Sequence, residues 1–142
     1  MEEMKMKVVL SPGAYMPVRA HSDDAGYDLF CREDCCIFPN ARAKIDTGVH
    51  MAIPSGYEGH IRSRSSVMLN KGCITDGTID SGYTGSISVI LFNLSGKLVE
   101  IKKGEKIAQI VIEPIFTPEL EEVDCLEETE RGSGGFGSTG SF

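Results

Sequence analysis

Residues 86–94 read SISVILFNL, and residues 106–112 read KIAQIVI. Both stretches are short, rich in β-branched side chains and apolar on both alternating faces, which is typical of strands covered on two sides. We therefore expect these two strands to form the centre of the core. Turn-forming residues at 93–97 and 102–105 flank another short strand at 98–101.

Further strand signals lie towards the N-terminus. Residues 49–53 alternate in the manner of a strand, Pro54-Ser55-Gly56 has turn chemistry, and residues 57–62 resume an extended pattern, which together predict a hairpin. The only helix that the pattern allows covers residues 65–71, where a serine can cap the first turn and Gly72 can end it. So many short strands predict an all-β fold, a sandwich or barrel of the jelly-roll type.

Length and charge restrict the classes of function. At 142 residues the chain is expected to form one domain, and 14 basic against 21 acidic residues give a net charge of −7. That sign argues against nucleic acid or an anionic membrane as the main partner, because both favour clustered Lys and Arg. No segment approaches the roughly 18 apolar residues that a membrane span needs.

The cysteines indicate a reducing compartment. The chain has five of them, an odd number, and residues 1–7 contain no apolar run resembling a signal peptide, so we expect a cytoplasmic protein. Cys31, Cys35 and Cys36 lie close together in sequence, as zinc ligands often do. No second Cys or His pair stands nearby at ligand spacing, so buried thiols are the preferred interpretation.

The composition changes near Glu127, where apolar residues give way to glycine and serine. Residues 131–142 hold five glycines, three serines and a threonine, which bury too little to offset their own ordering entropy. We therefore expect a folded domain over residues 1–126 and a mobile arm over residues 127–142.

This glycine-rich tail has the chemistry of a phosphate site. Successive glycine N–H groups, Ser and Thr hydroxyls and the Arg131 guanidinium can hold phosphate oxygens, and Phe136 can stack on a base. A P-loop is excluded, because Ser138 stands where that motif requires lysine and no helix follows. A plain flexible linker is the alternative interpretation.

Two further segments have the residues of a hydrolytic site. Residues 77–85 include Asp80, which can orient and deprotonate water, and Tyr83, which can pack against a sugar. The alternative is an ordinary turn acid with a tyrosine at the core edge. Residues 62–66 put serines and two arginines at a helix start, which suits either an anion or a solvated, capped turn.

Two more segments complete the set. Residues 24–29 place two acids around a tight turn, which can meet a hydrated magnesium ion or simply form the turn. Residues 104–109 place Gln109 among apolar strand residues. Its amide then needs partners, either backbone groups or a ligand.

Taken in order, these five segments resemble the five motifs of the trimeric dUTPase family. The matching segments cover nearly the whole chain and are residues 24–29, 64–66, 77–85, 104–109 and 131–140. The resemblance implies a jelly-roll β-barrel that forms a homotrimer, with three sites each assembled from more than one subunit. It also implies Mg²⁺-dependent hydrolysis of dUTP to dUMP and pyrophosphate, which supplies dUMP for thymidylate synthesis and keeps uracil out of DNA.

The same resemblance implies roles for single residues. Asp80 becomes the general base for the water that attacks the α-phosphorus, and Tyr83 packs against deoxyribose and leaves no room for a 2′-hydroxyl. Asp28 steadies the waters around the magnesium ion. The other implied substrate contacts are Arg64, Ser65, Ser66 and Gln109 on the phosphates, the main chain at Gly77 and Ile79 on uracil, and Arg131, Phe136, Gly137, Ser138 and Thr139 in the closing tail.

The chain departs from the family pattern at several positions. Ser63 replaces a usual proline, Thr84 replaces a common arginine or glutamine, and Glu105-Lys106 replaces the frequent Asp-Arg. The approach to the third motif, residues 73–76, is also shorter than in many relatives.

Two other functions are compatible with parts of this pattern. A dCTP deaminase is the nearest rival enzyme, but its chemistry needs an added acid or base near the ring, and the hairpin shows no extra carboxylate for that role. A non-catalytic trimer that binds a regulatory protein, with nucleotide as the switch, is the alternative outside the enzymes.

Overall fold

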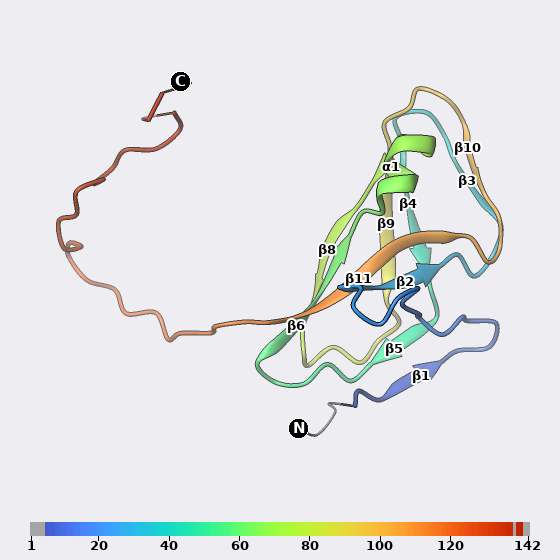
Figure 1. Ribbon diagram of the computed structural model, residues 1–142, viewed down its shortest axis with the longest axis horizontal. Helices are drawn as coiled ribbons and strands as arrows, with labels where there is room; N and C mark the ends of the chain where they lie inside the picture. The colour runs from blue at the N-terminus through green and yellow to red at the C-terminus, as the bar shows by residue number, and fades with distance from the viewer. Residues whose placement is uncertain (1–4, 138, 141–142) are drawn as a thin grey trace.

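The computed structural model describes residues 5–137 and 139–140, and Figure 1 shows a β-barrel with a long C-terminal extension. The described residues form one helix and eleven strands. The helix is α1 (Ser65–Lys71), and the strands are β1 (Val8–Leu10), β2 (Gly26–Phe30), β3 (Cys35–Ile37), β4 (Arg42–Asp46), β5 (Val49–Met51), β6 (Tyr57–Arg62), β7 (Cys73–Ile74), β8 (Asp76–Ile79), β9 (Ser88–Asn93), β10 (Val99–Ile101) and β11 (Lys106–Pro114).

The strands form two main sheets and two small ones. The larger sheets have the orders β2-β11-β6-β8 and β4-β9-β7, and the pairs β1-β5 and β3-β10 complete the barrel. Every pairing between these strands is antiparallel, and most neighbours come from distant parts of the chain, as β2 and β11 do. The expected all-β, jelly-roll-like fold is confirmed.

The core lies between the two larger sheets. Leu29 and Ile110 are fully buried from the four-stranded sheet, and Val89 and Leu91 are fully buried from the three-stranded sheet. Burying four such side chains contributes roughly 6–12 kcal/mol, because each adds about 1.5–3 kcal/mol. The strands expected at the centre of the core are therefore there.

The expected coverage on two sides holds for β11 and is wrong for β9. On β11 the buried residues lie on both faces, and they are Ile107, Ala108, Ile110 and Val111. On β9 the outward Ile90 and Phe92 remain 44% and 40% exposed. No second layer of the same chain covers the outer face of the three-stranded sheet in the described residues, so the apolar pattern on both faces does not correspond to two covered faces within one chain.

The hairpin expected over residues 49–62 is wrong, although both of its strands form. β5 pairs with β1, whereas β6 pairs with β11 and β8. The turn between them passes the chain from one sheet to another: the Tyr57 N–H donates to the Pro54 carbonyl at 3.1 Å, and Gly56 takes a φ of +87°. Alternation identified the strands, but it contains no information about their partners.

The helix forms over the expected residues, with one difference at its start. Gly72 ends α1 in the left-handed conformation, at a φ of +66°, and donates its N–H into the last turn. No side chain caps the other end, where Arg64 is the N-cap residue, so the expected serine cap is wrong. Ser63 instead bonds both backbone groups of Thr75, each at 2.9 Å.

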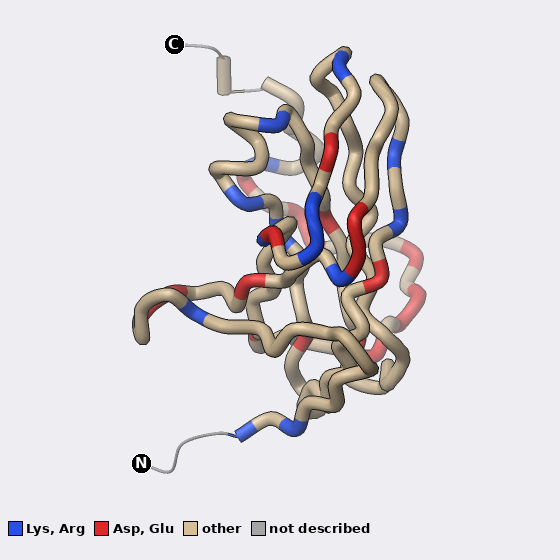
Figure 2. Tube along the Cα trace, turned by 90° about the vertical axis from the view of Figure 1, so that its right-hand side faces the viewer, with Lys and Arg blue, Asp and Glu red and all other residues tan. Residues whose placement is uncertain are grey.

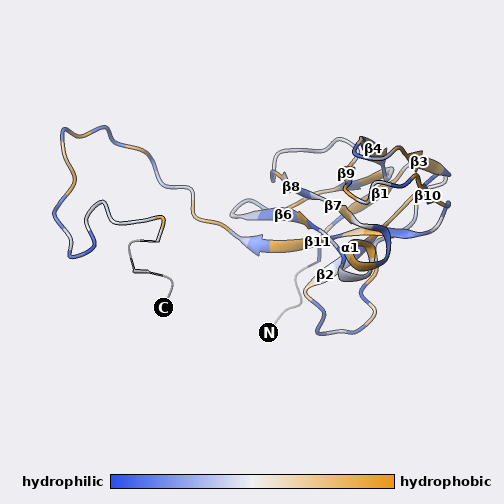
Figure 3. Cartoon of the chain, turned by 90° about the horizontal axis from the view of Figure 1, so that it is seen from above, coloured by the Kyte–Doolittle hydropathy of each residue, from blue (hydrophilic) through white to orange (hydrophobic). Residues whose placement is uncertain are grey.

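The chain leaves the barrel after Pro114. Figures 1 and 3 show the following residues extending away from it, with hydrophobic stretches interrupting a hydrophilic segment. Phe116 and Leu120 are 89% and 91% exposed. Among the described residues, the last hydrogen bond of this tail to the barrel comes from the Ile115 N–H, which donates to the Gly56 carbonyl at 2.9 Å. None of the described helices is long and apolar enough to cross a membrane.

Candidate active site

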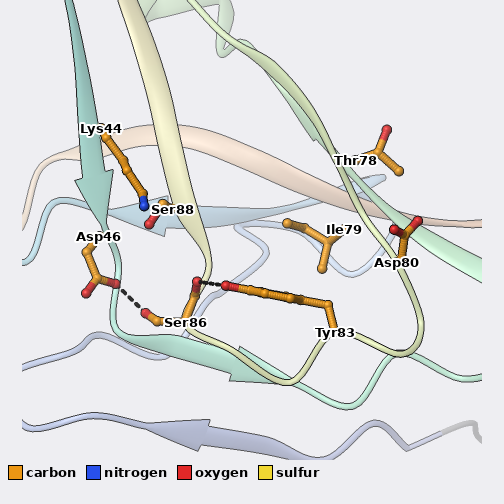
Figure 4. Close-up of a pocket in the computed structure, with 8 residues that line it drawn as sticks. All are labelled: Lys44, Asp46, Thr78, Ile79, Asp80, Tyr83, Ser86 and Ser88. Atoms are coloured by element: carbon orange, nitrogen blue, oxygen red, sulfur yellow. Dashed lines mark hydrogen bonds between the residues drawn. The ribbon is translucent and has the colours of Figure 1, made fainter.

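The residues expected in the site lie in two separate pockets and in the tail. The first, called here the Asp80 pocket, is a cavity of about 470 Å³ between β4, β8 and the start of β9 (Figure 4). Its lining residues are Lys44, Asp46, Thr78, Ile79, Asp80, Tyr83, Ser86 and Ser88. The second, the Arg64 pocket, is formed by the start of α1 with β2 and β11, and its lining residues are Ala20, Asp24, Ala25, Gly26, Asp28, Arg64, Ser65, Ser66, Lys106 and Gln109.

In the Asp80 pocket, a tight turn after β8 presents a carboxylate and an aromatic ring together. The Tyr83 N–H donates to the Asp80 carbonyl at 3.0 Å, and the Tyr83 hydroxyl donates to the Ser86 carbonyl at 2.7 Å. A Cβ atom at Gly85 would lie 2.5 Å from the Tyr83 hydroxyl oxygen, so only glycine lets the ring lie there. Within the described residues the Asp80 carboxylate has no hydrogen bond or ion pair, which leaves it available to a water molecule.

The strand before Asp80 offers backbone groups to a ligand. β8 is an edge strand, because among the described residues it pairs only with β6 in the four-stranded sheet. The strand includes Gly77 and Ile79, and its other side has backbone donors and acceptors without a strand partner. These groups lie next to the Asp80 pocket, which Ile79 helps to line.

The Arg64 pocket has a central carboxylate between two cations. The Arg64 Nε lies 3.1 Å from one oxygen of Asp28, and the Lys106 Nζ lies 3.3 Å from the other. Arg64 and Lys106, with the Ser65 and Ser66 hydroxyls beside them, supply donors that suit an anion, and two acids, Asp24 and Asp28, line the same pocket. Figure 2 shows that basic and acidic segments lie side by side over the barrel in this view.

Gln109 is held at the floor of the Arg64 pocket by the backbone. Its Nε2 donates to the Ser63 carbonyl at 3.1 Å. A Cβ atom at Gly26 would come within 3.0 Å of the Gln109 Cβ, so the glycine makes room for the amide side chain. The backbone therefore satisfies one amide hydrogen of Gln109, and its carbonyl oxygen makes no hydrogen bond with the described residues.

The two pockets do not meet within one chain. Asp28 lies on β2 and Asp80 follows β8, at opposite edges of the four-stranded sheet, which are roughly 14 Å apart at about 4.8 Å per strand spacing. The two pockets are also separated along the strand direction. Ile79, next to Asp80, pairs with Gly59, and Arg64 lies five residues further along the chain than Gly59, which corresponds to roughly 16 Å of extended chain. One chain alone does not place Asp80 beside Arg64 and Gln109.

The tail residues lie near neither pocket. In the described segment between 116 and 137, no side chain bonds to the barrel, and the Arg131 Nε instead donates to the Gly134 carbonyl at 2.6 Å. Phe136 is fully exposed. Gly137 and Thr139 are in the same extension, and Ser138 lies outside the described residues.

The residues of these pockets that are missing from the expected set include three charged ones, Lys106, Lys44 and Asp46. In the sequence Lys106 is only a replacement within the fourth motif, although its register on β11 brings it to Asp28. Lys44 and Asp46 come from β4, which no motif includes. Their only signal in the sequence is a pair of charges near the end of a strand, and that is too common to be specific.

Comparisons with known proteins agree with this fold and these segments. The sequence profile of the dUTPase family matches residues 13–140. A deoxyuridine 5′-triphosphate nucleotidohydrolase of Clostridium tetani is 46% identical over 99% of both chains, and one of Mus musculus is 45% identical over 94% of this chain and 83% of its own.

Solved structures give the same result. A dUTPase of Staphylococcus bacteriophage 80alpha, solved with dUPNHPP, aligns with a TM-score of 0.90 at 37% identity, over 96% of this chain and 98% of its own. A dUTPase of phage phi11 of S. aureus, solved with a structural Mg(II) ion, aligns with a TM-score of 0.81 at 34% identity, over 88% of this chain and 100% of its own.

The barrel, its two polar pockets and these relatives define an enzyme of the hydrolase class that acts in nucleotide metabolism. The chain belongs to the dUTPase family.

Proposed function

We propose that this protein hydrolyses dUTP to dUMP and pyrophosphate, with Asp80 as the general base for a water that attacks the α-phosphorus. The observation that supports it best is the Asp80 carboxylate, exposed and without a partner among the described residues, on the same turn as the ring of Tyr83. A carboxylate in that state can accept a proton from water, and the ring offers a flat apolar surface to a sugar.

The proposal assigns the nucleoside to the Asp80 pocket. The edge of β8, with Gly77 and Ile79, has backbone donors and acceptors that suit the edge of uracil. Tyr83 packs against deoxyribose at the position where a 2′-hydroxyl would otherwise lie. Selection for the deoxy sugar then follows from the placement of one ring.

The triphosphate is assigned to the Arg64 pocket of another copy of the chain. Arg64, Lys106 and Gln109 supply donors there, and the hydroxyls of Ser65 and Ser66 add two more. Because the two pockets of one chain lie at opposite edges of a sheet, a complete site needs at least two chains. We therefore include a homotrimer with composite sites in the proposal.

The exposed apolar face of the three-stranded sheet supports such an assembly. Ile74 pairs with Phe92 across β7 and β9, and the side chains of both, with Ile90, are about 40% exposed on the same face. Contiguous apolar surface of this kind is typical of an interface between proteins. Covering it with a second copy would give β9 the two covered faces that its sequence pattern indicates.

The Arg64 pocket fits a hydrated magnesium ion better than a directly bound one. Asp28 is 13% exposed, and both of its oxygens already face cations. Mg²⁺ keeps several of its waters and binds through substrate phosphates, so Asp28 would accept hydrogen bonds from those waters. The ion would neutralise charge on the triphosphate as the pyrophosphate leaves.

The tail is proposed to close the site last. Phe136 would cover the uracil, and Arg131, Ser138 and Thr139, with the backbone at Gly137, would hold the terminal phosphates. The positive φ angles at Gly132 and Gly137, of 56° and 93°, give this segment backbone conformations in which N–H groups can converge on an anion. Closure would exclude water from the reaction. A domain of residues 1–126 with an arm of residues 127–142 is part of this proposal.

The cellular setting is proposed from the family and the cysteines. Hydrolysis of dUTP would supply dUMP for thymidylate synthesis and keep uracil out of DNA. All five cysteines are free, as suits a reducing compartment such as the cytoplasm.

A nucleotide panel tests the proposed reaction. Purified protein is incubated with dUTP, UTP, dTTP and dCTP, with and without Mg²⁺, and pyrophosphate and ammonia are measured. We expect pyrophosphate from dUTP alone and only with Mg²⁺, whereas ammonia from dCTP would indicate the deaminase. Asp80→Asn is expected to keep the fold and dUMP affinity but to lower kcat by about 10²–10⁴-fold, the contribution of a general base. Turnover of dUTP by this variant at the parental rate would refute the assigned base.

A further inference from the structure

The turn that presents Asp80 and Tyr83 is held from outside by two side chains of β4 and β5. The Ser86 hydroxyl donates to the Asp46 carboxylate (Figure 4). Four residues further along, the Nδ1 of His50 lies 2.9 Å from the Thr84 carbonyl oxygen, and its Nε2 lies 3.0 Å from the Ser11 hydroxyl. With the hydroxyl donating to Nε2, Nδ1 bears the proton and donates to Thr84.

Ser86 links the first of these anchors to Tyr83. Its side chain bonds to Asp46, while its backbone carbonyl accepts the hydrogen bond of the Tyr83 hydroxyl at 2.7 Å. The Tyr83 hydroxyl is therefore hydrogen-bonded to Ser86, the same residue whose side chain bonds to Asp46. Figure 4 shows this row of contacts along one wall of the pocket.

Asp46 is itself well fixed as an acceptor. The Gly48 N–H donates to its carboxylate at 2.9 Å, and the Arg32 Nη1 lies 3.6 Å away. The hydrogen bond from Ser86, followed by that from Gly48 and by the charge of Arg32, holds the pKa of Asp46 below its ordinary value of 3.8. The carboxylate is therefore ionised at neutral pH, when charge-assisted hydrogen bonds are stronger than neutral ones.

We infer that Asp46 is a positioning residue that acts through Ser86 to fix the ring of Tyr83, and that it thereby increases the selection of deoxyribose over ribose. The inference rests on the proposed function, in which Tyr83 packs against the sugar. Asp46 touches no reacting atom in this scheme. Its effect falls on the position of the Tyr83 ring, which in the proposed function decides whether a 2′-hydroxyl fits.

The ratio of kcat/KM for dUTP to kcat/KM for UTP is the measurement that isolates this role. A variant that is merely less stable lowers the concentration of active enzyme, which lowers both values equally and leaves their ratio unchanged. A variant with a misplaced ring changes the ratio. Asp46→Ala and Ser86→Ala both remove the hydrogen bond between the Ser86 hydroxyl and Asp46. Asp46→Asn retains an acceptor oxygen for the Ser86 hydroxyl.

We expect Asp46→Ala to lower this ratio about tenfold, the size of one lost hydrogen bond to a charged group. Ser86→Ala should lower it similarly, and the double variant should lower it no further, because both changes break the same path. Asp46→Asn should restore most of the ratio. Asp34→Ala is the matched control, because Asp34 also accepts a backbone N–H, from Lys103 at 2.7 Å, but lines neither the Asp80 pocket nor the Arg64 pocket.

The outcomes separate this inference from the proposed function. A parental ratio in Asp46→Ala, or fully additive losses in the double variant, would overturn the role of Asp46 while leaving dUTP hydrolysis intact. A parent protein that does not hydrolyse dUTP would overturn the proposed function. Calorimetric affinities for dUMP and UMP test the ring position without turnover, and we expect the same tenfold change there. If Asp46→Ala does not fold, Ser86→Ala and Asp46→Asn decide the matter with the same two measurements.

Discussion

The Nε atom of Arg64 lies 3.1 Å from the Oδ1 atom of Asp28, and both residues of this ion pair line the Arg64 pocket. Lys106 approaches the other oxygen at 3.3 Å, so one carboxylate balances two cations in a place where Asp28 is only 13% exposed. Removing the carboxylate would leave the two cations facing each other.

The Asp28→Asn substitution should therefore act on stability and binding in opposite directions. Unfolding free energy from urea denaturation is expected to fall by about 2 kcal/mol, less than the 3–5 kcal/mol of a fully buried pair, because Arg64 and Lys106 are partly exposed. Pyrophosphate affinity without Mg²⁺ should rise several-fold in calorimetry, since the pocket gains net positive charge. Asp24→Asn is the control for stability, because Asp24 lines the same pocket without an ion pair among the described residues. Unchanged stability together with weaker pyrophosphate binding would contradict this account.

Gly85 and Gly82 form a matched pair within one turn. A Cβ atom at Gly85 would lie 2.5 and 2.6 Å from the Tyr83 Oη and Cζ atoms, whereas at Gly82 nothing lies within 4 Å. Gly85→Ala should displace the ring and lower kcat/KM for dUTP about tenfold, the cost of the lost Tyr83 hydrogen bond, with Gly82→Ala within about twofold of the parent. Steady-state kinetics of both variants check the prediction. Equal effects of the two substitutions would mean that the ring position does not matter to turnover.

Truncation after Glu130 should separate the tail from the barrel. The tail makes no described hydrogen bond to the barrel beyond Ile115, so the melting temperature should stay within about 1 °C of the parent, which corresponds to less than about 0.3 kcal/mol for a domain of this size. Turnover should fall at least about 10²-fold, because the closing arginine and the exclusion of water are lost. Differential scanning calorimetry and kcat measure the two quantities. Parental kinetics in the truncated protein would make the tail a plain linker.

The cysteines should react unequally. Burial raises the pKa of Cys35 to about 12, and burial also raises the pKa values of Cys31 and Cys73. Because the thiolate is the reactive form, these three thiols should remain unmodified by iodoacetamide at pH 8 while the exposed Cys36 is alkylated. Mass spectrometry of the tryptic peptides, with and without urea, gives the comparison. Labelling of Cys35 as fast as that of Cys36 in the folded protein would contradict the assigned burial.

Local sequence patterns predicted where the strands and the helix lie better than they predicted which strands pair with each other. The short apolar, β-branched runs at residues 86–94 and 106–112 located β9 and β11, and Gly72 marked the end of α1, because these signals lie within a few residues of each other. The pairing of β5 with β1 and of β6 with β11 depends on residues about 40 or 50 positions apart. Nothing in residues 49–62 favours those partners over a hairpin.

In the candidate site, too, local features could be predicted from the sequence and long-range contacts could not. Each segment with phosphate or acid chemistry was evident on its own, but their separation into two pockets follows from the strand order. Asp46 was missed because its partner Ser86 lies 40 residues away and is brought to it by the register of β4 on β9. Lys106 was missed for a similar reason, since only the pairing of β11 with β2 brings it to Asp28.

The placement of Asp80 and Asp28 at opposite edges of one sheet has a consequence for how activity depends on protein concentration. If the two pockets serve a single site, a newly made or highly diluted single chain has both pockets but cannot bring them together into one active site. Hydrolysis would then rise more steeply than in proportion to the number of chains and vanish on dilution. A cell that makes little of this protein would have disproportionately little of its activity.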